Sequence, residues 1–300
     1  MIPLDRAFAA RHLPRRPDDA HKGTMGALCS LTGSFGYSGA AILSARAALR
    51  SGVGLHYQVL PESIYPIFAT AVPESVCVPV TGSGVGTLSR ADLPAILNTA
   101  DRASAVLIGC GMGNTADTLA VLQAVIRRVT APLIIDADGI NTLAQHIDIL
   151  EESHAPVILT PHIKEFSRLT GLPVDAILHD PSAAAQRFSQ ERPDVVLVLK
   201  SHHTVIAQNG ELSIHERSNS GLAKGGSGDV LAGIIASLTA QGAEPFAAAA
   251  AGVFIHAEAG MICARQLCKT AMLPSDVIAA LPQVYHALES QTQSGASECK

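Results

Sequence analysis

The segment GLAKGGSGDVLAGIIASLTAQG, residues 221–242, joins a glycine-rich loop to an apolar stretch. The loop sequence GGSG, residues 225–228, comes directly before Asp229, and apolar residues follow at helical spacing over 230–238. Glycines let backbone N–H groups approach an anion, and a helix N-terminus carries a partial positive charge. The segment therefore predicts an anion-binding loop at the start of a helix, with Asp229 in its first turn.

A phosphate beside a single carboxylate is an arrangement suited to phosphoryl transfer, because the carboxylate can take the proton of an attacking hydroxyl. The same position also suits an ordinary N-capping Asp. The P-loop pattern G-x-x-x-x-G-K-[ST] does not occur in the chain. The run GCGMG, residues 109–113, is followed by Asn114 where the dinucleotide pattern G-x-G-x-x-G needs glycine. We therefore interpret residues 109–113 as a loop that brings backbone close to some other ligand.

Short apolar runs rich in β-branched residues lie on both sides of these loops. We expect strands at 26–31, 105–108, 133–135, 157–159, 195–199 and 204–207. Helix-like segments at 40–50, 115–129 and 230–238 alternate with them, and Asn209-Gly210 marks a hairpin turn. This alternation predicts an α/β layered fold with a mostly parallel sheet, whose ligands bind beyond the carboxyl ends of the strands.

Composition narrows the class of protein. Of 300 residues, 48% are hydrophobic and 16% are charged, with a net charge of −5. Such a chain is too apolar for disorder and lacks the basic clusters of a nucleic-acid-binding protein. Its longest apolar run, 246–255, ends at His256 and is too short for a membrane span. With no secretory signal pattern at its start, the chain is expected in the cytoplasm.

The cysteines support the same compartment. None forms a C-x-x-C pair, and we expect buried thiols in a reducing environment for most of them; the six are Cys29, Cys77, Cys110, Cys263, Cys268 and Cys299. We expect one domain over residues 20–290, a flexible segment over 1–19 and a loose tail over 291–300.

The GGSGD motif before an apolar helix resembles that of the ribokinase-like superfamily. The order of six segments is similar to that of the ADP-dependent NAD(P)H-hydrate dehydratases: residues 22–55, 108–113, 136–144 (DADGINTLA), 159–171 (LTPHIKEFSRLTG), 198–207 (VLKSHHTVIA) and 219–242. The resemblance covers about residues 20–285.

This resemblance implies a ribokinase-like three-layer sandwich, in which helices flank a central, mostly parallel sheet. The implied activity is that of a carbon–oxygen lyase, which dehydrates the S epimer of hydrated NADH or NADPH. ADP, or else ATP, would supply the phosphate and Mg²⁺ would assist, with AMP and phosphate formed from ADP. The family also implies a homotetramer and an epimerase that we expect to be a separate chain.

The resemblance also assigns roles residue by residue. Asp229 is the implied catalytic base and also contacts the substrate. The further substrate-binding positions are Ala40, Gly111 and His162. The nucleotide-binding positions are Lys200, Ser201, His202, His203, Thr204 and Gly228. The anion hole is Gly225, Gly226, Ser227 and Gly228. Glu165 is the implied contact to Mg²⁺, through water.

Some features depart from the family pattern or leave alternatives open. Ile163-Lys164 replaces the common Pro-Gly after TPH, and Ser201 replaces a glycine after Lys200. A surface His162, a helix-starting Glu165 and a solvated Lys200 are the simpler interpretations of those residues. Asp229 would equally serve a small-molecule kinase acting on a vitamin-precursor alcohol. A non-catalytic nucleotide sensor is a third hypothesis, although it has no need of that acid.

Overall fold

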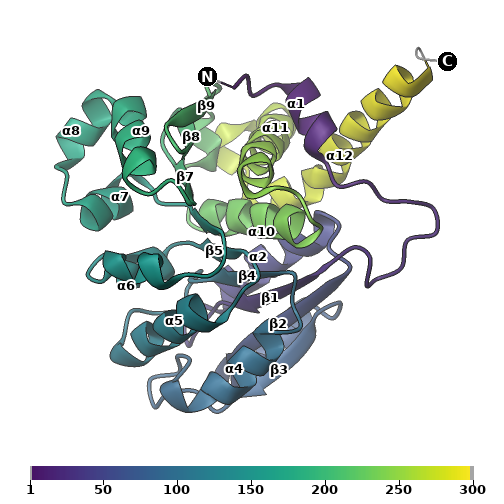
Figure 1. The fold of residues 1–300 in the computed structure, drawn as a ribbon. Helices are drawn as coiled ribbons and strands as arrows, with labels where there is room; N and C mark the ends of the chain where they lie inside the picture. Colours follow the sequence, from purple (N-terminus) through teal and green to yellow (C-terminus); the bar gives the residue numbers. More distant parts are fainter. Residues whose placement is uncertain (1, 298–300) are drawn as a thin grey trace.

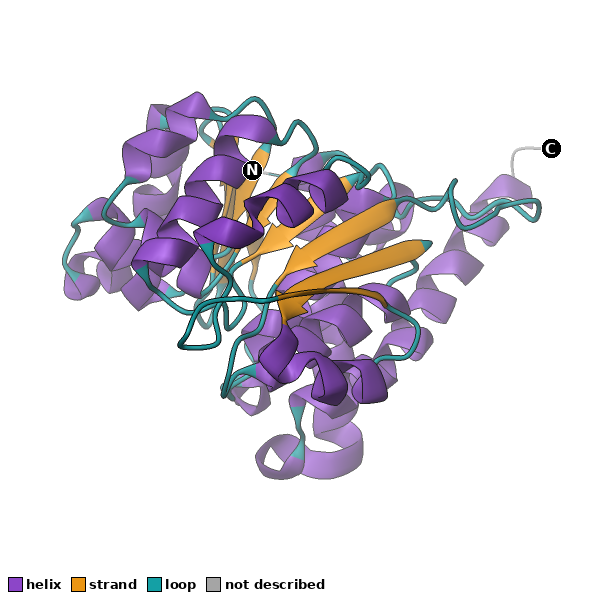
Figure 2. Ribbon diagram, turned by 90° about the horizontal axis from the view of Figure 1, so that it is seen from below, coloured by secondary structure: helices purple, strands orange, loops and turns teal. Residues whose placement is uncertain are grey.

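The structure is a computed structural model that describes residues 2–297, with side chains described up to residue 290. A nine-stranded sheet has the strand order β3-β2-β1-β4-β5-β6-β7-β8-β9. It forms the middle layer, with helices packed around it (Figure 2). Neighbouring strands from β3 through β7 are parallel, whereas the β7–β8 and β8–β9 pairs are antiparallel. The strands are β1 Ala27–Leu31, β2 Leu55–Pro61, β3 Val76–Val80, β4 Ala105–Ile108, β5 Leu133–Ile135, β6 Val157–Leu159, β7 Val195–Leu199, β8 Thr204–Gln208 and β9 Glu211–His215.

Helices cover both faces of the sheet (Figure 1). One face packs on α4 to α9 and the other on α2, α10 and α11, with α1 and α12 packed outside α11. The helices are α1 Arg6–His12, α2 Ser38–Arg50, α3 Tyr65–Ala71, α4 Leu93–Ala100, α5 Ala116–Arg128, α6 Asp138–Leu143, α7 Ile163–Thr170, α8 Val174–His179, α9 Pro181–Glu191, α10 Ser227–Ala240, α11 Pro245–Ala271 and α12 Pro274–Ser297. The predicted three-layer α/β fold is confirmed.

Strand β4 shows why the central strands are apolar throughout. Val106 and Ile108 lie in the core beneath α4 and α5, while Ala105 and Leu107 lie in the core beneath α10. Successive side chains of a strand point to opposite faces, so a strand covered on both sides needs apolar residues at every position. This explains why continuous apolar runs, and not alternating ones, mark the strands in the sequence.

The expected strands between 105 and 207 match β4 to β8 to within one residue, and the hairpin turn at Asn209-Gly210 joins β8 to β9. Strands β2 and β3 escaped the sequence pattern. In β2 the buried His56 bonds Ser30 and Ser75, and Gln58 donates to Thr32. Strand β3 lies at the edge, is partly exposed and contains a proline. Polar residues therefore interrupt the apolar pattern of β2, and the proline argues against a central strand at β3.

Both terminal segments that the sequence predicts to be flexible contain helix. Within the predicted flexible segment, residues 6–12 form α1, whose Phe8 is buried against the core around α10 and α11. The backbone of 291–297 continues α12, and the end of the predicted tail, residues 298–300, lies outside the described residues.

Helix α11 is the most apolar long helix of the described chain. Its length and composition would allow a membrane crossing, although no uninterrupted apolar run in it is that long. In the structure 83% of its most apolar window is buried, between α10 and α12. This burial is what a core helix requires.

Helices α2 and α10 approach each other closely, because Gly233 faces α2 without a side chain. A Cβ atom at Gly233 would overlap the backbone oxygen of Ser44 and lie 3.0 Å from the Cβ of Ala47. Small residues at this crossing therefore set the distance between α10 and α2.

Gly233→Ala is expected to destabilise the protein by about 1–3 kcal/mol, because the backbones must separate to admit the methyl group. Gly39→Ala is the matched control, since a Cβ there meets no atom within 4 Å. Urea unfolding of both variants measures the difference. Equal stability of the two variants would contradict the close contact.

Candidate active site

The carboxyl ends of β5, β6 and β7 meet at one edge of the sheet, beside the first turn of α10. A cavity of about 910 Å³ opens there. Asp136 follows β5, His162 follows β6 and Lys200 follows β7, while the segment 217–229 forms the facing wall. The cavity thus lies where ligands bind in open α/β sheets.

The first turn of α10 is built to accept an anion. Gly226 precedes the helix with φ of 95°, a left-handed conformation that favours glycine. The first N–H groups of a helix have no acceptor within it and point outward. At Gly228 a Cβ would come within 3.2 Å of Lys200 Nζ, so backbone and ammonium face the same space. Both features favour a bound phosphate.

Two neighbouring groups hold this loop in place. Lys224 Nζ donates to the backbone oxygens of Thr270 and Met272, at 2.7 Å each, near the end of α11. Ser227 Oγ lies 3.3 Å from Nε2 of the buried His256 on α11. The lysine of the GLAKGG sequence therefore has a structural role and anchors the loop to α11.

Asp136 and Lys200 form an ion pair at the base of the cavity. Lys200 Nζ lies 2.7 Å from Asp136 Oδ1, and Thr160 Oγ1 donates to the same oxygen at 2.6 Å. The Asp136 side chain is 1% exposed and that of Lys200 20%. Backbone N–H of Lys200 also donates to Pro161 at 2.8 Å. The pair therefore ties together the ends of three strands.

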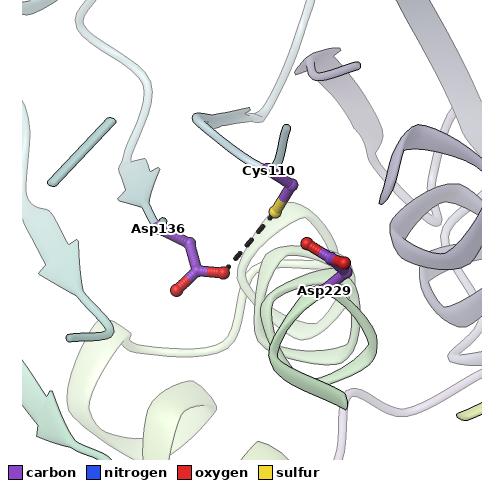
Figure 3. Close-up of side chains that lie close together, drawn as sticks. All are labelled: Cys110, Asp136 and Asp229. Atoms are coloured by element: carbon purple, nitrogen blue, oxygen red, sulfur yellow. Dashed lines mark hydrogen bonds between the residues drawn. The ribbon is translucent and has the colours of Figure 1, made fainter. Parts of the chain in front are cut away.

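Asp229 lies beside this pair, with a thiol between the two carboxyl groups (Figure 3). Cys110 Sγ donates to Asp136 Oδ2 at 3.6 Å. One ligand-type atom from each of Cys110, Asp136 and Asp229 lies within 4.8 Å of the others. In this cluster the Lys200 ammonium already supplies the positive charge that a metal ion would bring.

The two carboxyl groups differ strongly in proton affinity. Burial, reinforced by the charge of Asp136, raises the pKa of Asp229 to about 7. Burial also works to raise the pKa of Asp136, but the charge and hydrogen bonds of Lys200 and Thr160 outweigh it and lower that pKa. Asp136 is therefore ionised, and Asp229 can accept a proton near neutral pH.

His162 and Glu165 cap the start of α7. Glu165 Oε2 accepts the backbone N–H of His162 at 2.8 Å, and His162 Nδ1 accepts that of Glu165 at 3.0 Å. Burial raises the pKa of Glu165, while burial and the nearby Lys200 lower that of His162. In this capping box His162 Nε2 also lies 3.4 Å from Glu165 Oε1, and the half-exposed imidazole lies at the cavity wall.

Most of the predicted site residues line this cavity. They are His162, Glu165, Lys200, Ser201, His202, Thr204, Gly225, Gly226, Ser227, Gly228 and Asp229. Ala40 and Gly111 are not among its lining residues, but they lie together, since a Cβ on Gly111 would come within 2.8 Å of that of Ala40. His203 is exposed and its ring packs on His202. Ser201, the residue in place of glycine, donates to the backbone oxygen of His203 and closes the turn.

Sequence reasoning missed the importance of Asp136 and His256. Asp136 was assigned no role and stood only within the segment 136–144, although an Asp directly after a buried strand is a usable signal. His256 lies inside the apolar sequence of α11 and gives no local signal. It faces the cavity only because α11 packs along α10.

Solved structures define the class of fold. A ribokinase-like superfamily protein from Enterococcus faecalis superposes with a TM-score of 0.81 at 28% identity, covering 95% of both chains. The ADP/ATP-dependent NAD(P)H-hydrate dehydratase from Bacillus subtilis, co-crystallised with ATP and Mg²⁺, gives a TM-score of 0.80 at 29% identity. That alignment covers 95% of this chain and 98% of the other. The fold is therefore ribokinase-like.

Sequence comparison identifies the family within that class. The profile described as NAD(P)H-hydrate dehydratase matches residues 28–283, and the chain belongs to this family. It is 36% identical to the bifunctional NAD(P)H-hydrate repair enzyme of Moorella thermoacetica, over 97% of this chain and 55% of that protein. It is 30% identical to the ADP-dependent (S)-NAD(P)H-hydrate dehydratase of Xanthomonas campestris, over 94% of this chain and 96% of that protein. The chain thus spans about half the length of the bifunctional relatives it matches.

Asp229→Asn is expected to stabilise the fold at pH 8. The folded pKa of Asp229, about 7, lies above the ordinary value of 3.8, so the folded state holds the proton more tightly. Ionising the carboxyl therefore costs stability progressively as the pH rises from about 4 to about 7. The full cost is at most about 4 kcal/mol, and solvent that reaches the carboxyl reduces it.

Thermal unfolding of the wild type and Asp229→Asn at pH 4.5 and pH 8 tests this expectation. The gain in stability should be present at pH 8 and small at pH 4.5. A loss of stability at both pH values would show that the carboxylate is a stabilising cap and not a destabilised base.

Proposed function

We propose that the protein dehydrates the S epimer of hydrated NADH or NADPH to the intact cofactor, with ADP as phosphate donor, as a carbon–oxygen lyase. Membership of the dehydratase family supports this proposal. The observation that carries it is Asp229 in the first turn of α10, with a pKa of about 7, beside the anion-binding turn and Lys200. Of the carboxyl groups that line the cavity in the described part of the chain, Asp136 is paired with Lys200 and Glu165 caps α7, which leaves Asp229 to take a proton.

The chemistry follows from leaving-group ability, because water is a poor leaving group and phosphate is a good one. Asp229 takes the proton of the ring hydroxyl while the hydroxyl oxygen attacks the terminal phosphorus of ADP. The bond between that phosphorus and the oxygen of AMP breaks, and AMP leaves. The resulting phosphate ester then loses its C–O bond, which releases phosphate. Loss of a proton from the adjacent ring carbon restores the double bond. The balance is hydrate plus ADP giving cofactor, AMP and phosphate.

Other side chains supply charge and position. Lys200 and the α10 turn balance the charge of the transferred phosphate. The half-exposed imidazole of His162 lines the cavity, where it would contact the substrate. Ala40 and Gly111 lack bulk, so they would let the dinucleotide lie against the backbone of the loop at 109–113.

Mg²⁺ would act mainly through the nucleotide. Both carboxylate oxygens of Glu165 already contact His162, so direct ligation would break the α7 cap. A contact from Glu165 to Mg²⁺ through a water molecule would keep this cap intact. Such a contact is compatible with Mg²⁺, which is commonly held by phosphates, waters and few carboxylates. When bound, the ion would neutralise phosphate charge.

The proposed activity is tested by incubating the protein with chemically hydrated NADH, Mg²⁺ and ADP or ATP while the absorbance of reduced nicotinamide is followed. Recovery that depends on nucleotide is expected. A kinase for vitamin-precursor alcohols would instead leave a stable phosphate ester of its own substrate. Lack of recovery from either epimer, with either nucleotide, would overturn the proposal.

The rate should rise with pH. Because the base must be unprotonated, kcat/KM is expected to increase through about pH 7 and level off above it, following the pKa of Asp229. Asp229→Asn should lower kcat by at least about 100-fold while ADP still binds. The exposed Asp175→Asn serves as the matched control and should keep the wild-type profile. A flat profile, or an active Asp229→Asn, would show that another group takes the proton.

We further infer a cytoplasmic homotetramer, acting as one domain over residues 20–290, with a separate epimerase chain as its functional partner. The continuous sheet supports the single domain, and exposed Leu267 and Leu273 near the α11–α12 junction support self-association. Light scattering after gel filtration is expected to give four times the chain mass of 31.1 kDa. A monomer would contradict the assembly without affecting the proposed reaction.

A further inference from the structure

Two carboxyl groups of the same charge lie close together in the site, but only one has a cationic partner. Asp136 is paired with Lys200 and bonded by Thr160. Among the described residues 2–297, Asp229 has no ion pair within 4 Å. The 4.8 Å limit on the separation of their nearest atoms means that each carboxylate lies in the field of the other.

The elements packed around Asp229 contribute few other charges. Lys200 faces it from the end of β7, and Asp138 lies farther away at the start of α6. From α11, His256 is buried and its pKa is lowered to about 4, so it is neutral at working pH. From α2, Ser44 and Ala47 lie against Gly233 of α10, and neither carries a charge. Asp136 is therefore the dominant negative charge near Asp229.

Cys110 occupies the space between the carboxyl groups as a thiol. Its side chain is fully buried, and burial raises its pKa well above the usual range, with both carboxylates adding to the effect. A protonated thiol donates a weak hydrogen bond, here to Asp136. The thiol adds no charge, but its hydrogen bond to Asp229 lowers the pKa of that carboxyl and so opposes the effect of Asp136.

We propose that Asp136 is a positioning residue that, together with its partner Lys200, controls the pH at which the Asp229 carboxyl releases its proton. The three bonds to Asp136, from Lys200, Thr160 and Cys110, hold the negative charge at a constant place. Like charges close together cannot both ionise easily, and the group that holds the cation ionises first. Asp229 is left as the group that exchanges a proton near neutral pH.

The role in catalysis rests on the proposed function, in which Asp229 is the base. A carboxylate of ordinary acidity beside a phosphate would bind the hydroxyl proton weakly. Raised basicity makes the transfer more favourable, while at pH above 7 the group remains unprotonated and ready. Asp136 would thus affect the rate without touching the substrate.

The experiment measures the titration of Asp229 directly, in the ligand-free full chain, by NMR of ¹³C-labelled aspartate carboxyl groups, with Asp229→Asn to assign the signal. Asp136→Asn is expected to lower the pKa of Asp229 by about one to two units, because it removes a charge and leaves Lys200 unpaired. Lys200→Met is expected to raise it, because the cation that favours the ionised form of Asp229 is removed.

Two controls separate charge from structure. Asp138→Asn makes the same chemical change at the more distant acid and should shift the titration far less. Thr160→Val removes a bond to Asp136 but keeps every charge, and it should likewise shift the titration little. A merely structural role for Asp136 would not move the titration in opposite directions in Asp136→Asn and Lys200→Met.

The proposal is overturned if Asp136→Asn folds and its Asp229 pKa lies within about 0.3 unit of the wild-type value. It is also overturned if Asp136→Asn and Lys200→Met shift the Asp229 pKa in the same direction. Should Asp136→Asn fail to fold, the carboxyl signal of Asp136 in the wild type decides. The proposal requires Asp136 to stay ionised throughout the titration of Asp229, and an Asp136 that is protonated in that range overturns it. The pH profile of kcat/KM should move with the titration. If the wild type shows no dehydratase activity but the titrations follow the expected order, the proposed function fails and the electrostatic role of Asp136 stands.

Discussion

A parallel sheet must be covered on both faces, and the rest of this structure depends on that constraint. Helices on each side bury the strands, so the free edge at the carboxyl ends of β5 to β7 becomes the place where polar groups collect. Asp136, His162 and Lys200 each come directly after a strand. Their chain positions are far apart, and only the shared edge of the sheet makes them one site.

The two carboxyl groups at that edge differ in their charged partners. The buried Lys200 compensates one carboxylate and leaves the other, Asp229, with raised proton affinity. The same burial that destabilises the ionised Asp229 makes it a useful base in the proposed reaction. Part of the stability available to the fold is therefore given up at the site where the chemistry is expected, a common feature of active sites.

Small residues serve both packing and binding in this chain. Gly233 lets α10 lie against α2, Gly226 permits the turn before α10, and Gly111 lies against Ala40. The scarcity of aromatic residues fits loops that approach ligands through their backbone. Close contact between α2 and α10 also sets where Asp229 stands relative to the sheet, so packing far from the cavity contributes to its geometry.

The sequence by itself determined the α/β class, strands β1 and β4 to β8, the anion-binding turn and the candidate base Asp229. It could do so because periodicity, glycine spacing and motif order are local properties of the chain. It could not reveal β2, whose polar His56 and Gln58 find their partners on neighbouring segments. Nor could it show the Asp136–Lys200 pair, the thiol between two carboxyl groups, or His256 behind Ser227. Tertiary structure decided these features, because proton affinity and burial depend on groups distant in sequence that the sheet brings together.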